Sequence, residues 1–537
     1  MKKYISIILI SLAVAGSSCK KNYLDLTTNP NVPAVTTPDL ALTGALKSTA
    51  DIANGPDPNP IGSSVTYGGI YIQYAAWIGY LSQSTGFQPF TNIEQYQFTT
   101  SDFNGSWYYN YANIANYNDL LNSTTNPYYQ AIAKIMMAYD FEALVDSYNN
   151  VPYTQALQGL KNLNPTYDTG QSIYTDLMKQ LDAAIVLIQK APASTAAPTS
   201  SDIMYGGNMT NWIKFANTLK LRLCIRVTNV ASLESTFQTA VAATSALGYI
   251  DDTNGGLVNP GYLNSDADGG QQSPLWLSYG FTQSGSLQTY RSEYQANSFA
   301  ANYYAKNNDP RLVEVYSSTP TPDAYKATNL TANCAVNYQI VGSDTLTVVS
   351  TTFGGSQPPA GTIDGVAGTL ITPSVVGPGL LVSPTQSAVI LSSAESLFLQ
   401  SEAVARGIIG GNAAALYNAG IAASFEFDQV PGADAAAAAY ALQPAIAYPT
   451  GGTLTAQVDA IIMQKWAALN VFGAFEAFNE ERRTGIPNVP TSIYQGANAP
   501  NQVTRIFYPF IEYSTNSVAV AAQGTINKFT SKIFWAQ

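Results

Sequence analysis

Apolar residues recur at helical spacing along much of the chain. In the segment 173–188 they follow one another at steps of three and four, at Ile173, Leu177, Leu181, Ile185 and Ile188. Such a stripe covers one face of an α-helix and turns that face toward a core. Segment 131–148 has the same pattern through Ile132, Ile135, Met136 and Tyr139. It stops at Asn149, Asn150 and Pro152, which are typical of a helix end.

Further segments with helical character are 105–121, 211–227, 392–407, 412–427 and 461–483. They come in pairs separated by short breaks of Gly, Asn or Pro, which indicates helical hairpins. Segments 255–288 and 319–384 have little period and are rich in Gly, Pro, Ser and Thr. They are too long for ordinary connections, so we expect functional loops or an inserted subdomain. The pattern predicts a mainly α-helical protein.

The first residues have the order of an export signal. Lys2 and Lys3 precede an apolar run over 4–14, and small residues then lead to Cys19. The run is shorter than the ~18 apolar residues that span a bilayer. A cysteine after small residues resembles a bacterial lipoprotein signal, in which the mature chain begins at an acylated Cys19, although Gly16 stands where a leucine is usual. The alternative is an ordinary signal peptide that leaves Cys19 as a free thiol.

Composition narrows the classes of function. Hydrophobic residues make up 46% of the 537 residues, which is enough for a sizeable core. Charged residues make up only 11%, against ~25% in ordinary soluble domains, so the surface depends on neutral polar side chains. The net charge of −11 argues against nucleic-acid binding, which needs Lys and Arg to neutralise phosphates.

The chain has no histidine, which removes Ser-His-Asp and Cys-His nucleophile systems and histidine zinc sites. Paired carboxylates remain possible, and such a pair would allow a glycoside hydrolase. Besides Cys19 there are only Cys224 and Cys334, so at most one internal disulfide can form. Cys224 stands in a helical segment, where a buried, small apolar role is the more common one.

Seven segments together resemble one family, the SusD/RagB outer-membrane nutrient-binding lipoproteins, and more closely its second SusD-like branch. Their order is that of the family and spans nearly the whole mature chain. After Cys19 they are YLDLTTNPNVP (23–33), AYDFEALVDSYNNVPYTQAL (138–157), PTYDTGQSIYTDLMKQLDAA (165–184), NWIKFANTLKLRL (211–223), NDPRL (308–312), AESLFLQSEAVARG (394–407) and QKWAALNVFGAFEAFNEERRTGIP (464–487).

The resemblance implies a SusD-like α-helical fold with four tetratricopeptide-like helix pairs and a loop-rich capping region that carries the ligand site. We therefore expect a lipoprotein signal peptide over 1–18 and one nutrient-binding domain over 19–537, with cap segments near 55–105 and 250–385. The implied protein is anchored in the outer membrane, faces the cell surface and captures a glycan or a peptide. A SusC-like TonB-dependent transporter would take the ligand for import. The resemblance implies a protein that is not an enzyme and that has no cofactor.

Two aromatic stretches are candidates for the ligand site, because aromatic rings pack against the apolar faces of sugars. In the first stretch, 65–90, Tyr67, Tyr71, Tyr74 and Trp77 form a helical stripe, for which core packing is the alternative, whereas Tyr80, Phe87 and Phe90 run into a Gly/Pro break. In the second stretch, 269–295, Phe281 and other rings stand without period among Gly, Pro and Ser, where loop anchoring is the alternative. We predict ligand contact for Tyr74, Trp77, Tyr80, Phe87, Trp276, Tyr279 and Tyr290.

Three weaker motifs have structural explanations. Asn264, Asp266 and Asp268 before Gly269 match the start of a calcium loop, but Leu275 replaces the acid expected at its end, so a polar turn is the better interpretation. Arg482 and Arg483 stand beside Glu480 and Glu481 and are expected to form ion pairs within the scaffold. Asp309 and Arg311 lead to the same expectation.

Two alternatives to nutrient capture stay open at this point. One is a carboxylate-based glycoside hydrolase attached to the same membrane. The other is a helical-repeat adaptor that binds only protein. The family resemblance favours capture, and the missing histidines weaken the hydrolase independently.

Overall fold

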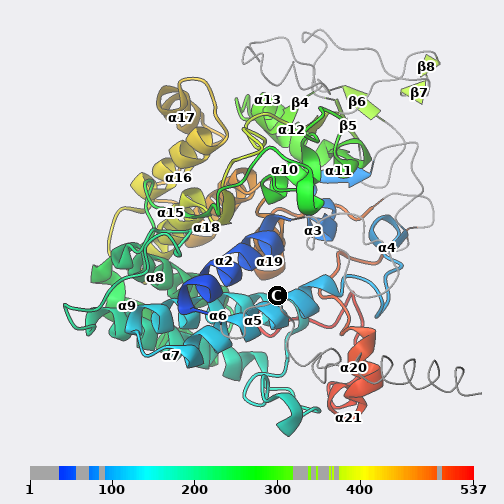
Figure 1. The fold of residues 1–537 in the computed structure, drawn as a ribbon. Helices are drawn as coiled ribbons and strands as arrows, with labels where there is room; N and C mark the ends of the chain where they lie inside the picture. Colours follow the sequence, from blue (N-terminus) through cyan, green and yellow to red (C-terminus); the bar gives the residue numbers. More distant parts are fainter. Residues whose placement is uncertain are drawn as a thin grey trace, which may run out of the picture.

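The computed structural model describes residues 36–55, 72–83, 91–317, 374–492, 497 and 499–537, together with four short strands between 337 and 367. Helices dominate the described part, as the sequence pattern predicts (Figure 1). No helix in these ranges is both long and apolar enough to cross a membrane.

Five consecutive helices form the lower layer in Figure 1, and each packs against the next one along the chain. They are α5 (Gly105–Ser123), α6 (Pro127–Tyr148), α7 (Gly170–Gln189), α8 (Met209–Arg226) and α9 (Ala231–Thr244). The predicted stripe of α7 is buried from Ile173 to Ile188. Thr169 begins this helix by accepting a hydrogen bond from the backbone N–H of Ser172.

A second group of helices follows later in the chain: α15 (Ser393–Ala405), α16 (Ala413–Phe427), α17 (Ala433–Ala441), α18 (Leu454–Ala468) and α19 (Ala474–Thr484). Helix α15 packs against α16 and α18, and it also contacts α8, so the two groups share a boundary. Helix α2 (Pro38–Asn54) packs against α5, α6 and β10 (Ala388–Leu391). We call these two groups and α2 the scaffold.

The prediction of one helix over 461–483 is wrong. Helix α18 ends at Ala468 and α19 begins at Ala474, with Val471 between them at a left-handed φ of 64°. That conformation is rare for a β-branched residue. Tertiary contacts hold the turn, because the Asn470 amide donates to the hydroxyls of Tyr304 and Tyr316. Sequence periodicity continues through the turn and does not reveal it.

A region of short elements lies above α2 in Figure 1, and we call its residues 274–317 the cap. It contains α10 (Pro274–Tyr279), α11 (Thr289–Glu293), β3 (Tyr294–Ala296), α12 (Ser298–Lys306), α13 (Leu312–Val315) and β4 (Tyr316–Ser317). The bounds of the cap segments expected near 55–105 and 250–385 stay a prediction.

Short antiparallel strand pairs join segments that are distant in sequence. Strand β1 (Leu81–Gln83) pairs with β3, β4 pairs with β9 (Val375–Val376), and β10 pairs with β2 (Gly256–Val258). Two further pairs, β5 with β6 (Asn337–Gln339, Leu346–Val348) and β7 with β8 (Thr362–Ile363, Val366–Ala367), are local. The pairs of β1 with β3 and of β4 with β9 fix the cap to segments before and after it in the chain.

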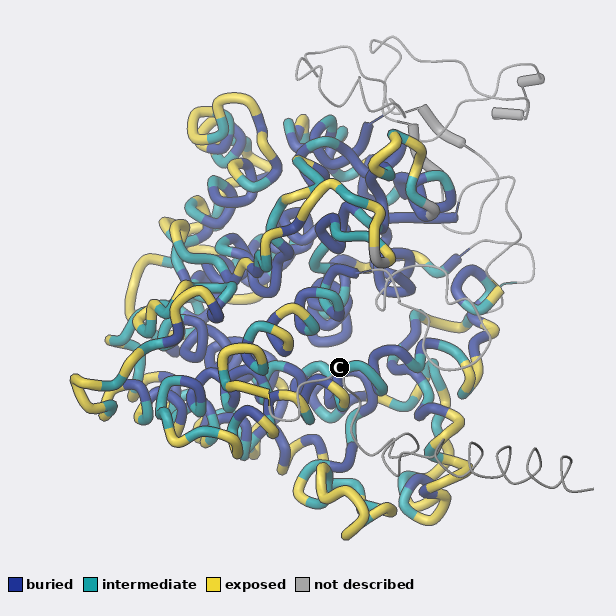
Figure 2. The backbone as a smooth tube through the Cα atoms, viewed as in Figure 1, coloured by how far each residue is buried: buried dark blue, intermediate teal, exposed yellow. Residues whose placement is uncertain are grey.

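All six residues of α3 (Ile72–Trp77) are buried. The remaining short elements are α4 (Thr91–Glu94), η1 (Gly159–Lys161), η2 (Ser245–Leu247), η3 (Ala267–Gly269), α20 (Phe510–Thr515) and α21 (Ser517–Ala521). Figure 2 shows buried backbone running through both helix groups and the cap, with exposed backbone at the outer turns. The main apolar cluster includes residues of the scaffold and of the cap. The extent of one domain over 19–537 stays a prediction.

Candidate functional site

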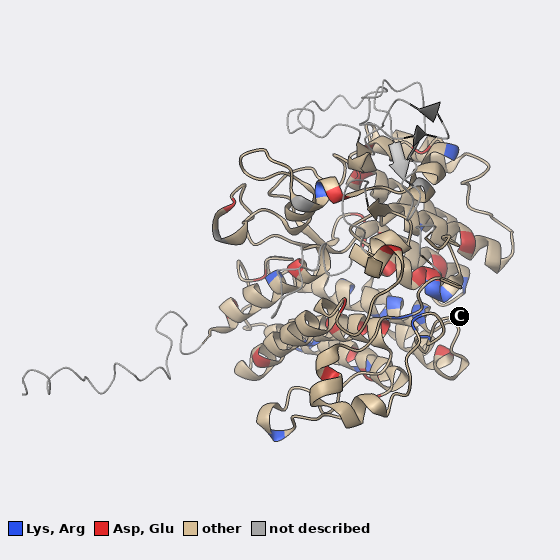
Figure 3. Cartoon of the chain, turned by 90° about the vertical axis from the view of Figure 1, so that its right-hand side faces the viewer, with Lys and Arg blue, Asp and Glu red and all other residues tan. Residues whose placement is uncertain are grey.

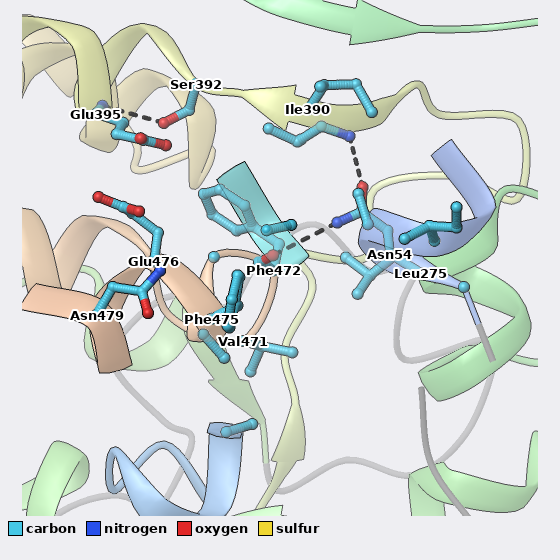
Figure 4. Close-up of a pocket in the computed structure, with 18 of the residues that line it drawn as sticks. Asn54, Leu275, Ile390, Ser392, Glu395, Val471, Phe472, Phe475, Glu476 and Asn479 are labelled. Carbon is cyan, nitrogen blue, oxygen red and sulfur yellow. Dashed lines mark hydrogen bonds between the residues drawn. The ribbon is translucent and has the colours of Figure 1, made fainter. Parts of the chain in front are cut away.

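A cavity lies where the cap meets the scaffold (Figure 4). It is enclosed by the C-terminal end of α2, by α3, α6, α8, α10 and β10, and by the turn between α18 and α19. Its volume is about 100 Å³. Because ligand pockets begin at roughly 300 Å³, the cavity holds a small group, and a larger ligand would extend over its rim.

Asn54, the last residue of α2, holds three walls of the cavity together. Its amide donates to the backbone oxygen of Phe472 at 3.4 Å and accepts from the backbone N–H of Val389 at 2.6 Å. Figure 4 shows Asn54 between β10 and the α18–α19 turn. The side chain therefore connects α2 to two segments that are more than 300 positions away in sequence.

Aromatic and aliphatic side chains line one part of the cavity. Phe472 and Phe475 come from the α18–α19 turn and the start of α19, Tyr139 comes from α6, and Tyr279 comes from the cap. The Tyr139 hydroxyl donates to the backbone oxygen of Ile390 at 3.3 Å. These rings offer apolar faces from scaffold and cap together.

Charged side chains form the floor of the cavity. Arg222 of α8 donates to both carboxylate oxygens of Glu142, at 3.0 and 2.5 Å, and to Glu395 at 3.2 Å. Figure 4 shows the carboxylates of Glu395 and Glu476 on the same side of the cavity. Burial and the charge of Glu476 raise the pKa of Glu395, while Arg222 opposes that rise.

The floor belongs to a larger buried network of ion pairs. Arg226 pairs with Glu476 at 2.5 Å, and Lys465 pairs with Glu476 at 2.7 Å and with Glu480 at 2.9 Å. Arg483 then contacts Glu480 at 2.5 Å. The network joins α8, α18 and α19. In Figure 3, basic residues in blue and acidic residues in red lie side by side near the C-terminal end of the chain.

The pKa values follow from this pairing. Burial works against ionisation of Glu476, but Arg226 and Lys465 outweigh it and lower the pKa of this carboxyl. Burial raises the pKa of Asp146 to about 6 against the opposing charge of Arg226. Because Arg226 and Lys465 hold Glu476 in its ionised form, this carboxyl is poorly placed to act as a general acid.

The expected ion pairs around Arg483 and Arg311 are confirmed. Arg483 contacts Glu480 and also Glu402 at 2.8 Å, and Arg311 contacts Asp309 at 2.6 Å. Glu481 differs from the expectation, because it accepts a hydrogen bond from the backbone N–H of Val489 and burial raises its pKa to about 8.

Arg482 also differs from the expected ion pair. It donates to the backbone oxygens of Asp146 and Thr504, and its guanidinium lies 4.5 Å from the ring centre of Phe478. Neutral acceptors and an aromatic face therefore replace the expected carboxylate.

The first aromatic stretch is packed inside the protein. Tyr74, Trp77 and Tyr80 are at most 1% exposed. The ring of Tyr74 lies 4.9 Å from that of Phe475, and the Tyr80 hydroxyl donates to the backbone oxygen of Trp466 at 2.5 Å. Core packing, the alternative for this stripe, describes all three residues. Tyr67, Tyr71, Phe87 and Phe90 lie outside the described residues.

The second aromatic stretch is buried within the cap, with Trp276, Tyr279 and Tyr290 between 5% and 8% exposed. Trp276 donates to the backbone oxygen of Phe281 at 2.8 Å, which anchors the loop after α10. Tyr290 lies beside Tyr294. Of the predicted ligand residues in the described ranges, only Tyr279 lines the cavity.

The sequence interpretation did not single out several residues that line the cavity, among them Asn54, Tyr139, Arg222, Glu395, Phe472 and Phe475. Tyr139 belongs to a stripe that was assigned to the core, and the two phenylalanines stand in a segment that was assigned to one helix. The Gly473 between them was the only local signal of a turn.

The calcium-like motif forms a polar turn. The Asp266 carboxylate accepts from the backbone N–H of Gln283 at 2.9 Å, and the Asn264 amide oxygen accepts from the Gln272 amide at 2.6 Å. The Asp268 side chain lies outside the described residues. Within those residues, no group of three or more acidic or cysteine side chains is arranged to hold a metal ion.

Cys224 is a free thiol inside α8. Burial raises its pKa to about 12. Cys19 and Cys334 lie outside the described residues.

The chain belongs to a SusD-like family whose description is "Starch-binding associating with outer membrane", and the match covers residues 59–509. This agrees with the family resemblance seen in the sequence. No curated protein matches the chain.

Solved structures share the fold over nearly the whole chain. An outer membrane protein from Bacteroides vulgatus, described as probably involved in nutrient binding, is 24% identical, covers 94% of this chain and 100% of its own, and has a TM-score of 0.68. A chitin-binding SusD homologue from Flavobacterium johnsoniae is 21% identical, with 92% and 98% covered and a TM-score of 0.69. A SusD-like protein from Bacteroidetes is 19% identical, with 94% and 100% covered and a TM-score of 0.72.

Proposed function

We propose that this protein captures a glycan at the outer membrane and hands it to a SusC-like TonB-dependent transporter. The observation that carries the proposal is the family match over residues 59–509, with its description of starch binding and outer-membrane association. The fold shared with a chitin-binding homologue supports a glycan as the ligand. Anchoring through an acylated Cys19 and exposure at the cell surface are parts of the same proposal.

Capture without catalysis agrees with the chemistry of the described residues. The acids nearest the cavity are held by Arg222, Arg226 and Lys465. The sequence supplies no histidine as a base. A glycan is largely neutral, which suits a chain with only 11% charged residues.

We place the ligand at the mouth of the cavity between cap and scaffold, with Tyr279 as the predicted aromatic contact. Trp276 and Tyr290 are proposed to support the loops around it. Tyr74, Trp77 and Tyr80 are buried too deeply to offer a ring face without local opening, so we assign them to the support of α3 and β1. Phe87 stays a proposed contact.

Isothermal titration calorimetry of the mature chain tests the proposal, with maltohexaose, chitohexaose and mixed peptides as ligands. Tryptophan quenching is a poor readout because all six tryptophans are at most 8% exposed: Trp77, Trp107, Trp212, Trp276, Trp466 and Trp535. Saturable heat with one oligosaccharide supports capture. Heat with peptides alone would contradict the glycan, and reducing-sugar release over time would contradict a pure binder.

Ala53→Phe locates the site, with Ala41→Phe as its matched control. Both alanines stand in α2 and are partly buried, but only Ala53 lines the cavity. We expect Ala53→Phe to weaken glycan binding by about tenfold, or ~1.4 kcal/mol, and Ala41→Phe to leave it unchanged. Equal effects of the two variants would move the site away from this cavity.

Transfer to a transporter is tested by detergent extraction of membranes. We expect the intact chain to co-purify with a large β-barrel protein and Cys19→Ser to leave the membrane fraction. Co-purification with no barrel would contradict the proposed partner, while glycan binding would remain independently measurable.

A further inference from the structure

A second hollow lies on the scaffold, away from the cap. It is a groove of about 420 Å³ between α5, α6, α7 and the loop that follows α6. This volume falls within the roughly 300 to 1,000 Å³ of small-molecule sites. Helix α6 contributes Lys134, Met137 and Phe141 to the lining of the groove.

Helix α6 separates this groove from the cap cavity. Tyr139, Glu142 and Asp146 of the same helix line the cavity, whereas Lys134 and Phe141 line the groove. At 3.6 residues per turn, the two sets occupy largely opposite faces of the helix. A ligand in the groove therefore makes no contact with one in the cavity.

The loop wall of the groove is rigidly built. The Asp168 carboxylate accepts from the backbone N–H groups of Tyr153 and Thr154, at 3.0 and 2.9 Å, and from the Thr154 hydroxyl at 2.9 Å. Leu157 follows at a left-handed φ of 60° and is 37% exposed. A wall that is fixed before the ligand arrives reduces the entropy that binding costs.

The floor and the rim of the groove have different chemistry. Tyr153 and Phe141 pack edge to face, with ring centres 4.7 Å apart, and they form an apolar floor with neighbouring aliphatic side chains. Asn118, Asn122 and Gln180 bring neutral amides to the rim. In the described part of the chain, the Asn118 amide has no hydrogen-bond partner and is partly exposed.

Hydrogen bonds through Gln180 connect Lys134 and Asp176 at one side of the groove. Lys134 donates to the Gln180 amide oxygen at 2.8 Å, and Gln180 donates to Asp176 at 3.1 Å. Asp176 also accepts from the Tyr153 hydroxyl at 2.6 Å. The side-chain amides of Asn118 and Asn122 remain for sugar hydroxyls, and a sugar ring can rest on the apolar carbon of the floor.

We propose that this groove is a second glycan site, which holds one or two sugar rings of a neutral oligosaccharide whose other end is free to reach elsewhere. This inference rests on the proposed glycan-binding function and extends it. Two separate sites on one protein raise the residence time of a long polymer at the surface, because rebinding becomes intramolecular.

Hydrogen–deuterium exchange of the full mature chain, with and without chitohexaose or maltohexaose, tests this site. We expect the oligosaccharide to slow exchange in the loop over 151–162. The double variant Asn118→Ala/Gln180→Ala should lose this protection and weaken groove binding by about tenfold or more. The matched control Asn116→Ala/Gln171→Ala changes the same residue types on α5 and α7 outside the groove, and it should retain the protection.

The outcomes separate the two proposals. Protection confined to the cap, with the loop over 151–162 unchanged, overturns the groove site and leaves the proposed function intact. Protection of the loop by peptides alone also overturns it. If no oligosaccharide binds anywhere, the proposed function itself fails. An unchanged melting temperature in both double variants keeps the comparison free of unfolding.

Discussion

The scaffold and the cap are held by different chemistry. In the scaffold, Arg222, Arg226, Lys465 and Arg483 are almost fully buried and pair with carboxylates from neighbouring helices. The cap is joined to the scaffold by neutral hydrogen bonds, among them those from the Tyr304 hydroxyl. In a chain with only 11% charged residues, buried charges therefore hold the helices of the scaffold together, whereas neutral groups join the cap to the scaffold.

Tyrosine hydroxyls and backbone oxygens make most of the junction between cap and scaffold that we describe. Tyr304 donates to the backbone oxygen of Ala467 at 2.8 Å, and the Tyr316 hydroxyl accepts from the Asn470 amide at 2.9 Å. Arg311 has its counter-ion, Asp309, inside the cap and reaches the scaffold through the neutral side chains of Ser424 and Gln464. Breaking one such neutral contact costs less than exposing one member of a buried ion pair.

The largest effect is expected from Arg483→Met, which takes one buried cation away from both Glu402 and Glu480, although Arg406 still contacts Glu402 and Lys465 still contacts Glu480. Removing one partner of a buried pair costs about 3–5 kcal/mol. The control is Lys47→Met, because Lys47 forms an ion pair with Asp51 in which both side chains are more than 40% exposed, and its loss should cost about 0–1 kcal/mol. Urea unfolding followed by circular dichroism measures both, and equal costs would remove the distinction between the regions.

A pH-dependent effect is expected at Asp428, where the end of α16 meets the cap. Its carboxylate accepts from Ser424, and burial raises its pKa to about 8 although Arg311 opposes the rise. The folded protein therefore keeps a proton that the unfolded chain releases above its ordinary pKa near 4. This contribution to stability is fully present at low pH and is lost as pH rises from about 4 to about 8.

Asp428→Asn should remove that dependence, because an amide stays neutral. We expect the variant to gain up to about 4 kcal/mol relative to the native chain between pH 5 and pH 8, because these three pH units lie between the unfolded and the folded pKa and each is worth about 1.4 kcal/mol. Chemical unfolding at both pH values measures the difference. Parallel pH profiles for the two proteins would show that Asp428 is ionised in the folded state.

Tyr304→Phe should weaken the junction by a smaller amount. The change removes the bond to the backbone oxygen of Ala467 and one of the two hydroxyls that accept from the Asn470 amide, at a cost of about 1–3 kcal/mol. Tyr513→Phe on the exposed side of α20 is the control and should change stability by less than about 0.5 kcal/mol. A cost for Tyr304→Phe as large as that for Arg483→Met would contradict the comparison.

The smallest effect is expected at Cys224. Burial in α8 and a pKa raised to about 12 keep its thiol from reacting as a thiolate. In a Cys334→Ser background, Ellman's reagent at pH 8 should label Cys224 only after unfolding by urea. Rapid labelling of the folded chain would show that α8 opens locally.

The sequence by itself determined the elements whose signal is local. Periodic apolar positions predict α7 correctly because one helix face must be buried wherever its neighbours lie. Adjacent charges likewise predict the pairing of Arg483 with Glu480, since residues three apart share a helix face. The family assignment also follows from the sequence, because it depends on the order of the segments along the chain and not on the contacts between them.

Only the tertiary structure decided the sites. The cavity exists because Asn54, Tyr139 and Phe472 come together from segments that are dozens to hundreds of residues apart, and no local pattern encodes such a contact. The same holds for the turn at Val471, which contacts from the cap maintain. Aromatic richness in the sequence cannot tell a ring that faces a ligand from one that fills the core, because the two differ only in what packs against them.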